Sequence, residues 1–163
     1  METVFQNLTQ YQTAGLIVMM VVLPLLLNTL YIWYLANQSK QWPKVSGTIQ
    51  TINIAASELK MHLEYSYKVQ GETYKNKRIF FTNSKYYKKI RAKEFEEKYK
   101  EGQQVSVFYN PNKHSMAVLE PGRSHGVISA IVLLVLLFSL GYIAFFNESL
   151  FITIINQLFQ MFN

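Results

Sequence analysis

Two long runs without a charged residue constrain this chain more than any other feature. They cover Ala14–Ala36, which is 23 residues, and Gly126–Phe146, which is 21 residues. With a rise of about 1.5 Å per residue, a helix of either length crosses a hydrocarbon layer about 30 Å thick. The alternative is two buried helices of a soluble protein, but 163 residues leave too little polar sequence to surround them. We therefore expect transmembrane helices over residues 14–36 and 126–146.

Basic residues are confined to the segment between these runs. All 16 Lys and Arg residues lie between Lys40 and Arg123, with 8 of the 10 acidic residues, so the segment carries 16 − 8 = +8 net charges. Basic residues close to the ends of spans favour the cytoplasmic side. We predict a multi-pass protein of a cell inner membrane with two spans, both termini outside and residues 40–123 in the cytoplasm. A central segment of this length can override the charge rule, which leaves the opposite orientation open.

Apolar residues alternate along the central segment, a period typical of strands. Five stretches show it: 45–55, 62–69, 72–81, 104–109 and 116–120. We expect turns or bends at Gly47, Gly71, Gly102 and Pro111, because these residue types suit such backbone conformations. The pattern predicts a membrane α+β fold, in which two transmembrane helices flank a small antiparallel five-stranded domain resembling a half-barrel. An edge strand of such a sheet could accept a strand from a partner.

The segment 84–101 breaks the alternation and predicts one amphipathic helix inserted into the β domain. Its basic residues gather near its start: Lys85, Lys88, Lys89, Arg91 and Lys93. One interpretation is a surface that binds anionic lipid headgroups, because each basic residue near such a surface contributes about 1 kcal/mol. The alternative is a solvated helix whose charges keep the domain soluble. Nucleic-acid binding is not expected, because no RNA- or DNA-binding motif is recognisable.

The tails also carry a helical pattern. Polar residues recur at spacings of four and three along residues 147–163, and this predicts an uncharged amphipathic helix after Glu148. Residues 4–11 show a weaker version, within a predicted N-terminal interfacial tail of residues 1–13. Such helices lie in a membrane interface or in an apolar groove of a partner.

Two residues inside the first run indicate helix packing within the membrane. Pro24 frees the carbonyl of Met20 from its helical hydrogen bond, and Asn28 places an amide in hydrocarbon, where it prefers a partner. That partner lies either on the second span of the same chain or on the span of another protein.

Four stretches in a fixed order resemble a known family. They are "WPKVSGTI" (42–49), "YSYKVQGETY" (65–74), "KYKEGQQVSVFYNPN" (98–112) and "AVLEPG" (117–122). Between two apolar spans, this order resembles the bacterial membrane proteins that share the domain of unknown function DUF3592. The resemblance implies the architecture described above and brings no established catalytic activity. The chain departs from the family pattern at Lys113 and His114, where a second proline is usual, and in its longer C-terminal tail.

The residues that could bind a metal or take part in catalysis are dispersed along the sequence. His62, His114 and His125 lack metal-ligand spacing, and no phosphate-binding loop, nucleophile elbow or acid–base pair is present. We therefore expect no enzyme activity, no cofactor, no metal and no small-molecule substrate. The expected partners are membrane lipids and either another membrane protein or further copies of the chain.

The sequence favours a membrane accessory or adaptor protein that presents its β domain to a membrane-protein partner. Two alternatives remain open. One is an immunity protein that neutralises a secreted antibacterial toxin, and the other is a module that binds anionic lipid surfaces.

Overall fold

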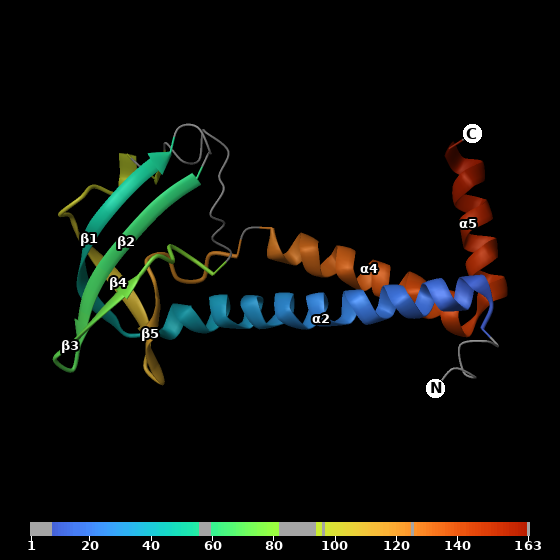
Figure 1. The fold of residues 1–163 in the computed structure, drawn as a ribbon, viewed down its shortest axis with the longest axis horizontal. Coiled ribbons are helices and arrows are strands. Elements are labelled where there is room, and N and C mark those ends of the chain that lie inside the picture. The colour runs from blue at the N-terminus through green and yellow to red at the C-terminus, as the bar shows by residue number, and fades with distance from the viewer. Residues whose placement is uncertain (1–7, 56–59, 82–93, 96, 125, 163) are drawn as a thin grey trace. The chain divides into compact units, whose positions relative to one another are not determined.

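The computed structural model describes residues 8–55, 60–81, 94–95, 97–124 and 126–162. Its elements are shown in Figure 1 and follow in chain order: helix α2 (Gln10–Gln38), the 3-10 turn η1 (Ser39–Gln41), strands β1 (Lys44–Ala55), β2 (Lys60–Val69), β3 (Glu72–Asn76), β4 (Gln104–Asn110) and β5 (Lys113–Val118), and helices α4 (Val127–Phe146) and α5 (Glu148–Phe162). Contacts divide the chain into two compact units, residues 1–31 with 126–163, and residues 32–125. The predicted outline is confirmed: in sequence, two apolar helices flank a five-stranded antiparallel sheet.

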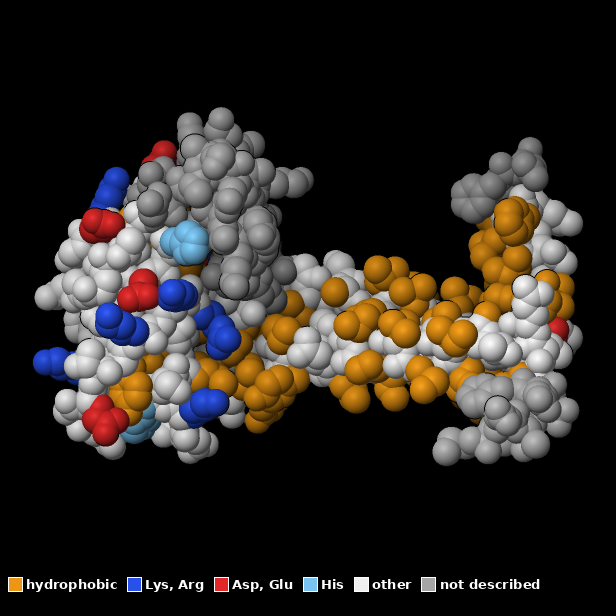
Figure 2. Space-filling view, in the orientation of Figure 1, with side chains coloured by type: hydrophobic (Ala, Val, Ile, Leu, Met, Phe, Trp, Pro, Cys, Tyr) orange, Lys and Arg blue, Asp and Glu red, His pale blue; other side chains and the backbone are white. Residues whose placement is uncertain are grey.

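Helices α2 and α4 are both long and apolar enough to cross a membrane. Figure 2 shows apolar side chains along both helices, and it shows the charged side chains mainly over the β domain, residues 40–123. The first helix starts at Gln10, four residues before the predicted Ala14. The reason is a capping box, in which the Gln12 N–H donates to Thr9 Oγ1 at 3.2 Å and the Thr9 N–H donates to Gln12 Oε1 at 3.0 Å.

The C-terminal helix α5 is separate from α4 because Asn147 caps it. The Leu150 N–H donates to Asn147 Oδ1 at 3.1 Å, which satisfies a backbone donor at the start of the new helix. Near this start, the Thr9 hydroxyl donates to Glu148 Oε2 at 2.8 Å, and the rings of Tyr11 and Phe151 lie 5.9 Å apart. The start of α5 is therefore held against the start of α2.

Helices α2 and α4 contact each other closely at two glycines, Gly15 and Gly141. A Cβ on Gly15 would lie 2.6 Å from the carbonyl oxygen of Gly141 and 3.0 Å from the Cβ of Ala144. Small residues let two apolar helices bring their backbones into contact, and this contact strengthens their packing. The face of α2 that carries Gly15 is thus the face that α4 occupies.

The sheet has the strand order β3-β2-β1-β4-β5, and every neighbouring pair is antiparallel. Strand β1 contains a bulge: Ile49 pairs with Tyr65, but after one extra residue Ile52 pairs with Leu63. Side chains alternate along a strand, so the extra residue returns Ile52 to the inner face. The bulge therefore keeps both halves of β1 packed on the core.

Gly47 lies inside β1, opposite Tyr67 and Val105, rather than at the turn expected from the sequence. A Cβ there would lie 2.5 Å from Val107 Cγ2 and 2.8 Å from the carbonyl oxygen of Ser66. The glycine is needed because the core and the neighbouring strand approach the backbone of β1 too closely for any side chain.

The sheet curls until its two edge strands meet, which gives it a nearly barrel-like form (Figure 1). The N–H groups of Leu119 and Glu120 donate to the Ile79 carbonyl oxygen at 2.9 and 2.8 Å. The Asn76 side-chain amide donates to the Ser115 carbonyl oxygen at 2.9 Å. The edges of β3 and β5 are thus turned towards each other instead of lying open for a partner strand.

Strand β3 ends at Asn76, five residues before the predicted Phe81. Asn76 Oδ1 accepts hydrogen bonds from the backbone N–H groups of Lys77 and Arg78, at 2.8 and 3.1 Å. This side-chain turn replaces the strand geometry and directs Ile79 towards the core.

The inner face of the sheet is lined by aromatic and aliphatic side chains. Tyr65 is fully buried, and its hydroxyl donates to the Arg78 carbonyl oxygen at 2.8 Å, so its polar end is satisfied. The rest of the buried cluster is Ile49, Leu63, Tyr67, Val69, Ile79, Phe80, Phe95, Tyr99, Val107, Ala117 and Leu119.

Replacing Gly47 with Ala is expected to lower the free energy of unfolding of the β domain by about 1–3 kcal/mol, because the new methyl group overpacks the core. Urea unfolding of the full chain in detergent, followed by fluorescence of the buried Trp42 in a Trp33→Phe background, measures the change. Ser46→Ala, at the exposed neighbouring position of β1, is the matched control. Equal stabilities of the two variants would contradict the close approach.

Candidate functional site

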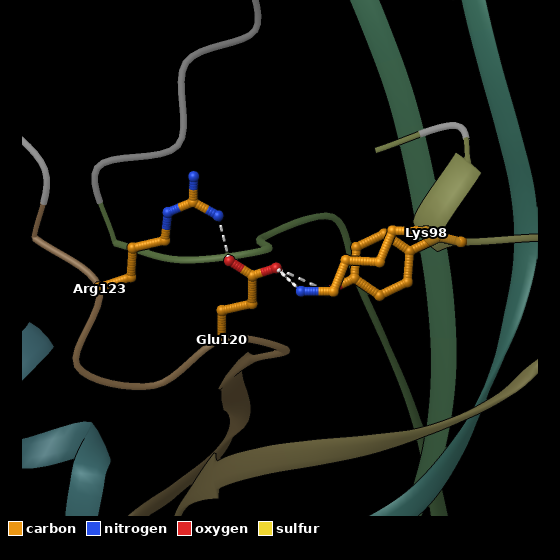
Figure 3. Close-up of polar contacts among 4 residues, drawn as sticks. Lys98, Glu120 and Arg123 are labelled. Atoms are coloured by element: carbon orange, nitrogen blue, oxygen red, sulfur yellow. Dashed lines mark hydrogen bonds and ion pairs between the residues drawn. The ribbon is translucent and has the colours of Figure 1, made fainter. Parts of the chain in front are cut away.

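A charged cluster forms where the chain leaves the β domain (Figure 3). Glu120 follows β5, and its backbone is held by the bond to Ile79, so its carboxylate has a defined position. Lys98 Nζ lies 2.6 Å from Glu120 Oε1, the Tyr99 hydroxyl donates to the same oxygen at 3.0 Å, and Arg123 donates to Oε2. Both carboxylate oxygens are thus engaged, and the Glu120 side chain is only 14% exposed.

Arg123 also lies against the aromatic core. Its guanidinium carbon is 4.5 Å from the centre of the Phe80 ring and 5.4 Å from that of Phe95. A cation over an aromatic face is attracted by the ring quadrupole, more strongly when it is partly shielded from water. Arg123 therefore ties the exit of the domain both to Glu120 and to the core.

The hydrogen bonds of the cluster determine its protonation. Burial alone raises the pKa of Glu120, but the bonds from Lys98, Arg123 and Tyr99 outweigh this effect and hold the pKa below its ordinary value. Burial, followed by the nearby charge of Glu120, raises the pKa of Tyr99. At neutral pH, Glu120 is ionised and Tyr99 is protonated, so the carboxylate attracts both Lys98 and Arg123 and accepts the hydrogen bond of the Tyr99 hydroxyl.

The entry and exit of the β domain meet at Ser39. Its buried hydroxyl donates to the Ala36 carbonyl oxygen at 2.6 Å and accepts a hydrogen bond from the Gly122 N–H at 3.0 Å. The aliphatic chain of Lys40 fills the space that a Cβ on Gly122 would need, and Gly122 adopts φ +74°. Sequence reasoning missed Ser39, because nothing in a single polar residue after an apolar run indicates a contact 83 positions away.

Four basic residues surround an open hollow of about 430 Å³ beside the meeting edges of β3 and β5. They are Lys75, Lys77, Arg78 and Lys113. Glu64 Oε atoms lie 3.7 Å from Lys75 Nζ and 3.4 Å from Lys77 Nζ, so one carboxylate faces two of the four cations. The sequence did not reveal this group, because the curl of the sheet is what brings residues 75–78 to residue 113.

The predicted lipid-binding residues Lys85, Lys88, Lys89, Arg91 and Lys93 lie outside the described residues, as does most of the predicted helix 84–101. Within that range, residues 94, 95, 97 and 98 are helical, and Phe95 and Tyr99 are buried in the core. Gly71 and Gly102 have φ values of +87° and +75°, and Pro111 lies in the turn between β4 and β5.

Pro24 and Asn28 are both exposed on α2, which continues without interruption through the proline. Asn28 comes 13 positions after Gly15, and at 3.6 residues per turn it lies about 140° around the helix from that glycine. It therefore faces away from the contact with α4. Neither an ion pair nor a hydrogen bond links its side chain to another residue in the described part of the chain.

The part of the chain that the structure describes contains no candidate metal site. No group of three or more His, Asp or Glu side chains there could hold an ion. His114 instead packs edge-on against the rings of Tyr74 and Tyr109.

Replacing Glu120 with Gln is expected to lower the free energy of unfolding at pH 7 by about 1–3 kcal/mol, because Lys98 and Arg123 lose their shared anion. Because folding lowers the pKa of Glu120, its contribution is complete above the ordinary value of 4.5 and is lost as pH falls through the folded value. The difference between wild type and variant should therefore shrink below about pH 4.5. Unfolding of the full chain in detergent across pH 3–8 measures it.

Glu64→Gln is the matched control. Its pairs with Lys75 and Lys77 are exposed, so its effect should stay below about 1 kcal/mol. An effect of Glu64→Gln as large as that of Glu120→Gln would contradict the special role of the cluster.

The comparison with known families identifies the β domain. The family described as a domain of unknown function (DUF3592) matches residues 45–124. No curated protein and no solved structure matches the sequence. The matched segment covers the sheet from the second residue of β1 onward and includes Glu120 and Arg123. It contains three of the four stretches that carry the resemblance, and residues 45–49 of the fourth. The resemblance is confirmed for this segment: the β domain of the chain matches the DUF3592 family over residues 45–124.

Proposed function

We propose that this chain is a non-enzymatic integral membrane protein that presents its β domain at the membrane surface to a membrane-protein partner. The observation that carries the proposal is the apolar surface exposed along α2 and α4. Met20 is 68% exposed, Leu27 58%, Ile128 63% and Leu136 58%. In water such a continuous surface would drive aggregation, whereas the hydrocarbon core of a bilayer covers it.

The charge distribution supports an orientation with both termini outside an inner membrane and residues 40–123 in the cytoplasm. Lys40 and Lys44 follow the first helix, and Arg123 precedes the second. The contact of Lys40 with Gly122 places Lys40 beside the segment that carries Arg123. Basic residues gathered at the ends of two spans favour the cytoplasmic face.

Helix α5 suits the opposite interface. Phe159 is 67% exposed and Met161 79%, while the helix carries Glu148 in its first turn and no other charge. An amphipathic helix of this kind, with its one charge at the start, lies flat between headgroups and acyl chains.

The β domain is built to offer side chains to a partner rather than a strand edge. Its two edges bond to each other through Ile79 and Asn76. The partly buried carboxylate of Glu120 is fully engaged by Lys98, Tyr99 and Arg123. Both features favour a rigid binding surface over a reactive site, which is why we propose an accessory role.

The chain contains no cysteine, so single cysteines report its topology without a background. In intact cells, a membrane-impermeant thiol reagent should label Asn156→Cys in α5 and leave Lys68→Cys in β2 unlabelled. In inside-out vesicles the pattern should reverse. Both variants should stay in the membrane fraction after alkaline carbonate washing.

The same preparation tests the accessory role. After purification in mild detergent, the chain should carry a second, stoichiometric membrane protein that is lost when surface residues of the β domain are replaced. Release of the chain by carbonate would refute membrane insertion. Labelling of Lys68→Cys in intact cells would refute the orientation, and recovery of the chain without any other protein would refute the accessory role.

The basic hollow favours a second candidate function, binding of anionic lipid headgroups. The cations Lys75, Lys77, Arg78 and Lys113 outnumber the carboxylate of Glu64, and their flexible side chains can converge on a phosphate. The Asn76 side chain fixes the backbone of Lys77 and Arg78 by accepting hydrogen bonds from their N–H groups. Basic residues near an anionic membrane surface contribute about 1 kcal/mol each.

Replacing Lys75, Lys77 and Lys113 together with Gln is expected to weaken the binding of phosphatidylglycerol by about 3 kcal/mol, since three basic contacts are removed. Titration of the full chain in neutral-lipid nanodiscs with short-chain phosphatidylglycerol measures the change. The triple variant of Lys44, Lys68 and Lys100 has the same net charge and is the matched control. Equal losses in both variants would show a general charge effect and exclude a site at the hollow.

A further inference from the structure

We propose that two copies of this chain associate through one exposed face of α2, with the Asn28 side chains paired across the interface. The inference deepens the proposed function, because it rests on the insertion of α2 into a membrane. The partner that binds to this face of α2 is a second copy of the same chain.

The face is a stripe with heptad spacing. Its members recur at intervals of four, three, four and three residues: Ile17, Val21, Pro24, Asn28 and Tyr31. All five are exposed, and Ile17, Val21 and Tyr31 keep 56–57% of their surface free. This spacing is the one by which two helices pack along a shared seam with a left-handed supercoil.

The stripe lies opposite the face that α4 occupies. At 3.6 residues per turn, each of its five positions is rotated by about 120° or more from Gly15, whose backbone touches Gly141. Val22, which is 6% exposed, belongs to the Gly15 face. The packing of α4 on α2 therefore leaves the stripe available to another helix.

Asn28, the fourth of the five stripe positions, supplies the amide for a polar contact. The neighbouring Thr29 hydroxyl donates to the Leu25 carbonyl oxygen at 2.7 Å, and the Ser139 hydroxyl of α4 donates to Val135 at 2.8 Å. Both hydroxyls are thus satisfied within their own helices. The Asn28 amide makes no such bond within the described residues, and an unpaired amide in hydrocarbon is unfavourable.

The chemistry of the amide favours a second copy as its partner. A carboxamide carries a donor and an acceptor, so two of them related by a twofold axis form reciprocal hydrogen bonds. Copies inserted in the same orientation place their α2 helices parallel, and each Asn28 then lies at the same depth as its counterpart. A single Asn in a heptad seam fixes the register of parallel helices in this way.

Cysteine cross-linking in membranes tests the face. Single cysteines at Ile17, Val21 and Tyr31 should form disulfide-linked dimers under mild oxidation, whereas cysteines at Val18 and Val22 should not. Each variant is first shown to resist carbonate washing, so that a failure of membrane insertion is distinguished from a failure of association. Cross-linking on the Val18 side, or cross-linking to another protein alone, would overturn the proposal.

Substitution of Asn28 tests the amide pair. We expect Asn28→Leu to weaken dimerisation by about 3- to 20-fold, measured by energy transfer between labelled full chains at varied protein-to-lipid ratios. Asn28→Gln, which keeps the amide, should restore part of the loss, and Thr29→Val should have no effect. An unchanged dimer in Asn28→Leu, or an equal loss in Thr29→Val, would exclude Asn28 as the pairing residue.

Discussion

The meeting of the two sheet edges is the constraint on which the rest of the β domain depends. A five-stranded sheet has two unpaired edges, and exposed edges recruit other strands. In this chain the Ile79 carbonyl oxygen accepts hydrogen bonds from the N–H groups of both Leu119 and Glu120. These bonds connect the segment after β3 to the segment after β5. The backbone that follows β5 is thereby held in one position. The Glu120 carboxylate and the Gly122 N–H, which lie on this stretch, are positioned by these two hydrogen bonds.

From that position the exit of the domain is joined to its entry. The Gly122 N–H donates a hydrogen bond to the Ser39 hydroxyl, just after α2. The Glu120 carboxylate accepts hydrogen bonds from Lys98, Tyr99 and Arg123. The helical residues around Phe95, the core and both connections to the apolar helices thus share one set of contacts.

The differences between the expected and observed elements have local physical causes. Capping by Thr9 and Gln12 extends α2 at its start, and Asn76 ends β3 early by bonding to the next two N–H groups. Periodicity of apolar residues does not report such side-chain bonds. Gly47 was expected at a bend because glycine is common there, but its role depends on the closeness of Val107 from another strand.

The sequence by itself determined the two apolar helices, the strand-rich segment between them, the asymmetry of charge and the family. These features depend on composition and on short-range periodicity, which a linear chain displays directly. Only the tertiary structure decided which residues meet: Ser39 with Gly122, Glu120 with Lys98 and Arg123, and the basic side chains around the hollow. Each of these groups includes residues far apart in the chain, as Lys98 is from Glu120, so the complete group forms only after the sheet has curled. The same holds for Asn28, because its direction relative to α4 follows from the contact between two glycines at the other end of the helix.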